Sequence, residues 1–313
     1  MLEIGHLDLG FETENGFYPA LFDVSFSLEK GKMHALVGES GCGKTISAMS
    51  ILRLLPKTAK ITGGKICFDG QNLLDLPEKD MQKIRGAKIA LIPQDPMTSL
   101  NPLFTIGEQL TEVIEAHHNL SGENIYKKAV ESLEMVQMPC AELKMKSYPH
   151  ELSGGMKQRA IIAMALSTNA EVLIADEPTT ALDVTIQAQI MNLLNEIKPQ
   201  TSILLITHDL ALVSEYADEV SVMYAGRIVE NAPAKDFFRT PNHPYSTALL
   251  KALPSDTTDK LQTIEGQPPT IQQTISGCRF HPRCENCMDI CKTYIPELKL
   301  IGENHYSACH LNN

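Results

Sequence analysis

The chain has 313 residues, of which 43 % are hydrophobic and 21 % charged, a composition typical of a globular protein and unlike that of a disordered one. Its net charge of −11 argues against a protein that mainly neutralises nucleic-acid phosphates, so we expect no nucleic-acid partner. No apolar run approaches the roughly 18 residues of a membrane span, and the first residues lack the basic-then-apolar order of a signal peptide, so we expect a cytoplasmic protein.

Strands and helices are predicted to alternate along most of the chain. Strands are expected within residues 1–37, then a helix over 46–55, then two strands with a short helix between them over 61–94, then a helical subdomain over about 95–170. Further strands are predicted at 172–175, 202–206 and 219–224, with a helix over 185–197. Strands separated by helices imply a parallel sheet with crossover connections, hence an α/β fold. Beyond about residue 235, prolines interrupt a polar tail.

A glycine-rich loop follows the apolar run 33–37. Its sequence, Gly38-Glu39-Ser40-Gly41-Cys42-Gly43-Lys44-Thr45, matches the phosphate-loop pattern completely and lies between a predicted strand and a predicted helix. The glycines let backbone N–H groups converge on the phosphates of ATP, and the start of the helix adds partial positive charge. We expect Lys44 to neutralise the β- and γ-phosphates and the Thr45 hydroxyl to coordinate Mg²⁺. A strand-to-helix turn that binds no nucleotide is the alternative.

Two adjacent carboxylates end the predicted strand 172–175. Asp176 is placed to hold Mg²⁺ through water beside the phosphate loop, and Glu177 can act as the general base that polarises the attacking water. An apolar run that ends in Asp-Glu is by itself usually a strand that meets solvent. The phosphate loop about 130 residues upstream makes the pair specific for ATP hydrolysis.

A Ser-Gly-Gly turn, in Leu152-Ser153-Gly154-Gly155-Met156-Lys157-Gln158-Arg159, precedes a predicted helix and is suited to bind an anion. As a lone tripeptide it would more often be a simple helix cap. In this order with the phosphate loop, it resembles the signature of ABC ATPases. The resemblance implies a P-loop NTPase cassette over residues 1–235, with a RecA-like core, an N-terminal antiparallel β subdomain and a helical subdomain, followed by a small Cys-rich C-terminal extension over 236–313.

The resemblance also implies roles for residues outside these motifs. Gln94 matches the glutamine that contacts Mg²⁺ and water and reports to the membrane subunit. The run Ala181-Leu182-Asp183 matches a loop that crosses the interface between two cassettes, and His208 matches the switch histidine that holds the γ-phosphate. No catalytic position departs from the family pattern, so the resemblance implies a cassette that hydrolyses ATP.

Two binding features depend on the family register and on a second subunit. Phe11 fits the register of the aromatic that stacks on adenine best, while Phe17 and Tyr18 are rivals. The family implies that Ser153, Gly154 and Gly155 bind the γ-phosphate of ATP held by an opposing cassette. Two cassettes then sandwich ATP head to tail, and each completes the site of the other.

Two stretches near the C-terminus indicate one branch of the family. They are His243-Pro244-Tyr245-Ser246 and Gly277-Cys278-Arg279-Phe280-His281-Pro282-Arg283-Cys284, and both resemble the tail of peptide and nickel importer cassettes. The signature with Met156 resembles that of the first of the two unlike cassettes that such importers carry. The implied partners are an unlike second cassette, two transmembrane permease subunits and an extracytoplasmic substrate-binding protein. The chain would then lie peripherally on the cytoplasmic face of the inner or plasma membrane.

Five of the eight cysteines lie in the C-terminal extension, and their spacing suits a [4Fe–4S] cluster or Zn²⁺. The frame that relatives share favours Cys278, Cys284, Cys291 and Cys309 as ligands, with Cys287 extra. Some members of the branch carry an iron–sulfur cluster there, which is our expectation. Zinc, joined by His281, His305 or His310, and free structural thiols are the alternatives.

The leading interpretation is the ATP-binding and hydrolysing subunit of an importer of di- or oligopeptides. Import of nickel or a metal chelate is the nearest alternative. A soluble ABC ATPase that acts on ribosomes or DNA is a further one, but such proteins usually carry two cassettes or long coiled-coil insertions, and this chain has one cassette and no such insertion. A redox or iron sensor would show activity that follows the state of the cysteines.

Overall fold

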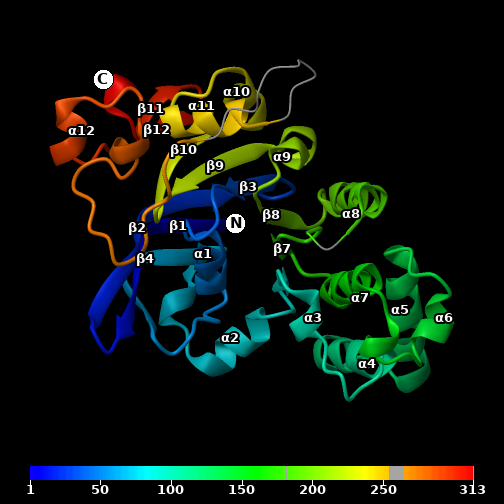
Figure 1. Cartoon of the computed structure of the whole chain (residues 1–313). Coiled ribbons are helices and arrows are strands. Elements are labelled where there is room, and N and C mark those ends of the chain that lie inside the picture. The colour runs from blue at the N-terminus through cyan, green and yellow to red at the C-terminus, as the bar shows by residue number, and fades with distance from the viewer. Residues whose placement is uncertain (181, 254–263, 313) are drawn as a thin grey trace. The chain divides into compact units, whose positions relative to one another are not determined.

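The computed structural model describes residues 1–180, 182–253 and 264–312, so Ala181 of the predicted interface loop lies outside the described residues. The chain divides into two compact units (Figure 1). The first comprises Met1–Leu76 and Ile206–Asn313, and the second comprises Pro77–Leu205. The chain passes from the first unit to the second after Leu76 and returns within strand β8 (Ser202–Thr207). None of the described helices has both the length and the apolarity that a membrane span requires.

The first unit contains the expected antiparallel sheet, with strand order β2-β1-β4-β5. Its strands are β1 (Leu2–Thr13), β2 (Gly16–Leu28), β4 (Ala59–Phe68) and β5 (Gln71–Asn72). Ile4 and Leu7 are both buried although they are three residues apart, because the pairing register shifts between them and His6 adopts a φ of 53°. Such a bulge turns two residues of odd spacing to one face of the sheet.

A second group of strands in the same unit includes part of the C-terminal extension. Strands β3 (Met33–Val37) and β9 (Glu219–Tyr224) are parallel, and β10 (Arg227–Pro233) runs antiparallel to β9. Strands β12 (His305–Ser307) and β11 (Lys299–Gly302) then continue from β10 (Figure 1). The strands at 33–37 and 219–224 were predicted, whereas the sequence analysis found no strand in 227–233 or in the extension.

Aromatic and aliphatic side chains from these strands form a core with helices of the extension. Val37, Val222, Phe237, Tyr245 and Phe280 belong to this one buried cluster. The helices of the unit are α1 (Lys44–Ile51), α9 (Leu210–Tyr216), α10 (Ala234–Arg239), α11 (Pro244–Lys251) and α12 (Asp289–Thr293), with short 3₁₀ turns η1 (Leu73–Asp75), η3 (His281–Arg283) and η4 (His310–Asn312). The extension therefore completes the core of the unit that carries the phosphate loop.

The second unit contains the parallel pair β6 (Ile89–Ile92) and β7 (Val172–Asp176) and the predicted helical subdomain. All residues of β7 are buried, as expected for a strand covered on both faces. The helices are α2 (Glu78–Ile84), α3 (Pro96–Ser99), α4 (Ile106–His117), α5 (Gly122–Met135), α6 (Ala141–Lys144), α7 (Gly154–Ser167) and α8 (Val184–Ile197), with a 3₁₀ turn η2 (Pro149–Glu151). Helices α4, α5 and α7 pack against one another.

Candidate nucleotide site and cysteine pocket

The phosphate loop connects β3 to α1 and needs glycine at three positions. Gly38 has a φ of 149°, and a Cβ atom there would lie 2.2 Å from the carbonyl oxygen of Met223. Gly41 and Gly43 have φ values of 77° and 112°, a region that favours glycine. The carbonyl of Cys42 accepts a hydrogen bond of 2.8 Å from the N–H of Gly226. The loop is thus a fixed turn whose backbone lies against the β9–β10 connection.

The Lys44 side chain folds back over this loop. It is only 6 % exposed, and its Nζ donates to the carbonyl oxygens of Gly38 at 2.7 Å and Glu39 at 3.0 Å. Burial raises the pKa of the neighbouring Cys42 thiol, which therefore stays protonated at neutral pH. An ammonium group held this way lies where the loop would receive phosphate, and Thr45 follows it in the first turn of α1.

The three candidates for adenine stacking lie on one hairpin. Phe11 and Tyr18 are cross-strand partners on β1 and β2, so their side chains leave the same face of the sheet. Phe17 leaves the other face, where its ring lies so close to Gly10 that a Cβ there would be 2.3 Å from Phe17 Cζ. The choice of Phe11 stays a prediction.

In the second unit, the predicted general base Glu177 meets Gln94, which was predicted to contact Mg²⁺. Gln94 follows β6, Glu177 follows β7, and Gln94 Nε2 donates to Glu177 Oε2 at 3.2 Å. Thr180 Oγ1 donates to the same carboxylate oxygen at 3.0 Å. Glu177 has a φ of 47°, which is uncommon for a residue other than glycine and costs on the order of 1 kcal/mol. Asp176, the preceding residue, is 1 % exposed at the end of the buried strand.

The Ser-Gly-Gly turn begins helix α7. Ser153 is its N-cap and accepts a hydrogen bond of 3.3 Å from the N–H of Met156, while Gly154 and Gly155 are the first two helical residues. The buried Gln158 donates to the carbonyl of Pro178 at 2.7 Å, which ties this helix to the segment directly after Glu177.

Asp183 is also a helix cap, and His208 stands next to one; neither cap was predicted from the sequence. Asp183 caps α8 and accepts from the N–H of Ile186 at 2.9 Å. His208 is exposed after β8, and the next residue, Asp209, caps α9. Asp183 stands two residues before the helix predicted over 185–197, so an Asp at this place could have identified the cap of α8, whereas no helix was predicted after Asp209.

The predicted site residues divide between the two units, and among them Gln94 and Glu177 are in contact. Lys44, Thr45 and His208 belong to the first unit. Gln94, Asp176, Glu177 and the Ser-Gly-Gly turn belong to the second. The roles of these residues in phosphate binding and in water activation stay predictions.

Comparison with known families identifies the chain. Residues 21–180 match the family described as ABC transporter. This chain is an ABC transporter ATPase subunit. Residues 229–291 of the chain, most of them in the extension, also match the family described as oligopeptide/dipeptide transporter, C-terminal region.

Curated relatives match the cassette over nearly its whole length. The oligopeptide transport ATP-binding protein AppD of Bacillus subtilis is 50 % identical over 99 % of this chain and 96 % of its own. The oligopeptide transport ATP-binding protein OppD of Salmonella typhimurium is 46 % identical over 99 % of this chain and 93 % of its own. The dipeptide transport ATP-binding protein DppD of Bacillus subtilis is 45 % identical over 100 % of this chain and 95 % of its own.

Solved structures agree with the cassette fold. A dimeric post-hydrolysis state of the ATP-binding cassette MJ0796 bound to ADP and Pi matches with a TM-score of 0.68 and 28 % identity, over 75 % of this chain and 99 % of that one. The cbiO1 protein from Clostridium perfringens, part of the complex cbiONQ, matches with a TM-score of 0.65 and 28 % identity, over 76 % of this chain and 90 % of that one.

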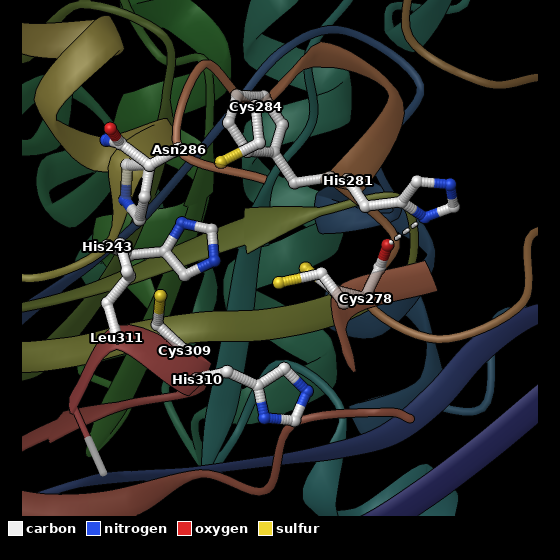
Figure 2. Close-up of a pocket in the computed structure, with 11 residues that line it drawn as sticks. His243, Cys278, His281, Cys284, Asn286, Cys309, His310 and Leu311 are labelled. Carbon is white, nitrogen blue, oxygen red and sulfur yellow. Dashed lines mark hydrogen bonds between the residues drawn. The ribbon is translucent and has the colours of Figure 1, made fainter. Parts of the chain in front are cut away.

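The C-terminal extension of the cassette contains a small pocket, which we call the cysteine pocket. Its lining includes the four predicted cysteines together with His243, Pro244, Phe280, His281, Asn286, His310 and Leu311. Figure 2 shows the thiols of Cys278, Cys284 and Cys309 directed toward a shared space. Burial raises the pKa of Cys278 to about 11 and also raises the pKa values of Cys284 and Cys309. Cys287 is not part of the lining.

His243 adds a hydrogen-bond donor to this pocket. Its side chain is 1 % exposed, and its Nδ1 accepts the N–H of Tyr245 at 3.0 Å, so the proton of the neutral ring lies on Nε2. Burial lowers the pKa of His243 to about 3, which keeps the ring neutral. Within the described part of the chain, Nε2 has no hydrogen-bond partner. The pocket is thus lined by four thiols and one buried N–H donor.

The same region offers no compact site for a single ion. No three His, Cys, Asp or Glu side chains among the described residues are grouped so that they could hold a metal ion. Tetrahedral zinc would bring its thiolates to about 3.8 Å from one another, because each Zn–S bond is about 2.3 Å. Two of the histidines considered for zinc are also engaged elsewhere, since His305 Nε2 bonds Glu230 at 2.7 Å and His310 Nε2 bonds the carbonyl of Tyr294 at 2.9 Å. These contacts count against the zinc alternative.

Proposed function

We propose that this ATPase powers the import of di- or oligopeptides. The observation that carries the proposal is the match of residues 229–291 to the oligopeptide/dipeptide transporter C-terminal region, together with relatives named for oligopeptide and dipeptide transport over 99–100 % of the chain. Nickel or metal-chelate import is the second candidate, because the resemblance of the extension covers both classes. The cargo would be selected by the partners, since none of the residues assigned above is a cargo site.

The residues of the two units supply the steps of hydrolysis. Lys44 neutralises phosphate charge, and Glu177 accepts the proton of the attacking water. The 3.2 Å bond from Gln94 Nε2 to Glu177 supports this role, because it orients the carboxylate that acts as base. Thr45, Gln94 and Asp176 would hold Mg²⁺, which supplies charge neutralisation at the phosphates. His208 would contact the γ-phosphate.

We further propose that the chain works in a pair with a second, unlike cassette, peripherally on the cytoplasmic face of the membrane beside two permease subunits, with a substrate-binding protein on the other face. Ser153, Gly154 and Gly155 would bind the γ-phosphate of the partner's ATP. The exposed start of α7 supports this assignment, because a helix N-terminus with free N–H groups favours an anion.

Reconstitution tests the proposed cargo. The chain would be co-expressed with the second cassette, the two permease subunits and the substrate-binding protein proposed above, and the complex would be assembled in liposomes. Labelled tri- or pentapeptide would be outside the liposomes, and ATP would be inside, where the cassettes face. We expect peptide uptake that stops when Glu177→Gln replaces the wild type. Uptake of Ni²⁺ with no uptake of peptide by the same liposomes would refute the peptide assignment and support the second candidate.

For the cysteine pocket we propose a [4Fe–4S] cluster bound by Cys278, Cys284, Cys291 and Cys309. A cluster suits the pocket better than one ion, because its four irons each take one thiolate and so accept a wider ring of sulfurs. Anaerobic purification should give brown protein with absorption near 400 nm and about four iron and four sulfide per chain. Colourless protein from the same preparation, with or without zinc, would refute the cluster. Cys287→Ser should keep the colour and Cys284→Ser should lose it.

A further inference from the structure

The second residue of the phosphate loop is held by the C-terminal extension. The Arg283 guanidinium binds the Glu39 carboxylate through two hydrogen bonds, 2.6 Å from Nη1 to Oε2 and 3.0 Å from Nη2 to Oε1. The backbone N–H of Glu39 donates to the hydroxyl of Tyr245 at 2.9 Å. We call these contacts of Arg283 and Tyr245 on Glu39 the clasp. All three residues belong to the first unit.

The clasp is rigid on the side of the extension. The Arg283 side chain is only 5 % exposed, and its Nε donates to the carbonyl of Glu265 at 2.9 Å. Tyr245 is fully buried and packs edge-on against Tyr224, with ring centroids 4.6 Å apart. Phe280 lies against both tyrosine rings, at 5.1 and 5.3 Å. A bidentate pair whose arginine is immobilised loses little side-chain entropy and is partly shielded from solvent.

The clasp leads directly to Lys44. Glu39, which the clasp binds, also accepts a hydrogen bond of 3.0 Å from Lys44 Nζ through its backbone carbonyl oxygen. Side chain, N–H and carbonyl of Glu39 are therefore all engaged, the first two by the extension and the third by Lys44. A shift of Glu39 changes the direction of its carbonyl and with it the place of the ammonium group.

We propose that Arg283 and Tyr245 are positioning residues for nucleotide binding: by fixing Glu39 they set the phosphate loop and the Lys44 ammonium for the phosphates of ATP. The C-terminal extension is then part of the machinery of the nucleotide site, in addition to any role toward partners or cargo. This inference rests on the proposed role of residues 38–45 as the phosphate cradle.

The contact could instead be a staple that only fastens the extension to the core, and the two roles differ in what they change. A staple affects the free energy of unfolding but not the nucleotide affinity of the folded chain. A positioning pair affects nucleotide affinity in chains that remain folded. Measuring both quantities on one set of variants separates the roles.

The experiment uses the full chain and MgATP, with the dissociation constant measured by isothermal titration and thermal unfolding followed without nucleotide. Arg283→Gln should raise the Kd for MgATP at least about 5-fold, the lower end of a typical coupling between two sites. Arg283→Lys should recover part of the loss, because the charge remains but the two-pronged contact does not. Tyr245→Phe keeps the ring packing, so it should fold, and it should weaken MgATP in the same direction by removing the acceptor for the Glu39 N–H.

The matched control is Arg279→Gln. Arg279 lies in the same segment of the extension, and its guanidinium stacks over the ring of Phe22, 3.8 Å from the ring centroid. Its substitution should leave the Kd within about 2-fold of the wild type. If Arg283→Gln and Tyr245→Phe lower the unfolding temperature while the Kd stays at the wild-type value, the clasp is a staple and the inference is wrong.

A further variant separates this inference from the proposed function. Lys44→Ala should abolish detectable MgATP binding if residues 38–45 are the cradle. Wild-type affinity in Lys44→Ala would overturn the proposed function itself, whereas lost affinity in Lys44→Ala with unchanged affinity in Arg283→Gln would overturn the clasp alone.

Discussion

The buried carboxylate of Glu230 links strand β10 to the C-terminal extension, and we expect its replacement to weaken the docking of the extension. Glu230 in β10 is 0 % exposed. Its Oε1 accepts from the N–H of Asn242 at 2.8 Å and from His305 Nε2 at 2.7 Å, and its Oε2 accepts from the N–H of His243 at 2.9 Å. One side chain thus joins β10 to β12 and to the start of α11.

Glu230→Gln keeps the shape but leaves only one oxygen. Whichever way the amide is turned, its NH₂ group faces at least one N–H donor that has lost its acceptor, and the remaining bonds are no longer charge-assisted. Hydrogen bonds to charged groups contribute about 1.5–3 kcal/mol each, so we expect a loss of about 2–4 kcal/mol in the free energy that docks the extension.

Amide hydrogen exchange measures this loss where it occurs. The amides of Tyr306 and Ser307 in β12, which pairs with β10, should exchange about 30- to 1000-fold faster, the equivalent of 2–4 kcal/mol. Glu303→Gln is the control, because Glu303 is an exposed residue in the turn between β11 and β12. Exchange in Glu230→Gln within about 2-fold of the control would show that the carboxylate does not hold the extension.

Three further predictions concern single residues. Hydrogen bonding from His34 and Lys32 lowers the pKa of Glu219 to about 2, below its usual 4.5, so the stability that Glu219 contributes is present above pH 4.5 and lost as the pH falls toward 2. In urea unfolding, the free-energy difference between wild type and Glu219→Gln should be on the order of 2 kcal/mol at pH 7 and should close over that pH range. A difference that does not change with pH would contradict the pairing. Arg159→Met should cost about 2–4 kcal/mol in urea unfolding, since the buried guanidinium donates to the carbonyls of Val136 and Gln137 and to Gln189; a cost below 1 kcal/mol would show that water replaces it. Gly38→Ala should cost at least about 2 kcal/mol and weaken MgATP binding, because of the 2.2 Å approach to Met223, and wild-type values for both would show that the loop can move aside.

Local signals in the sequence predicted the nucleotide machinery well. Strand β3 follows from the apolar run 33–37, and the phosphate loop follows from the glycine spacing of 38–45. The cap of α7 follows from the serine before Gly154. In each case neighbouring residues determine the local conformation. The strands predicted at 172–175 and 219–224 were found for a similar reason, because the first is a continuous apolar run and the second is rich in Val, Met and Tyr, and nearly all residues of both are buried.

Strand β10 and the two strands of the C-terminal extension, β11 and β12, were not predictable from local pattern. Strand β10 carries Glu230 in its middle and ends at Pro233, both unfavourable for a strand by propensity. Glu230 is tolerated there because three donors, which come from residues 12, 13 and 75 positions further along the chain, surround it. The bond between Arg283 and Glu39 spans 244 residues, and no periodicity or motif links two such charges.

These long-range contacts determine how the extension can be studied. Removing residues 236–313 would delete Tyr245 and Arg283 and would also uncover Tyr224 and the core around it. A truncated chain that fails to bind ATP would therefore not show whether the extension acts through Glu39 or only through the fold. Arg283→Lys and Tyr245→Phe avoid this ambiguity, because each keeps the bulk of the side chain in place while it changes one contact to the phosphate loop. Only a loss of MgATP affinity that occurs when the contact with Glu39 is changed and the packing is kept supports a role of the extension in holding the nucleotide.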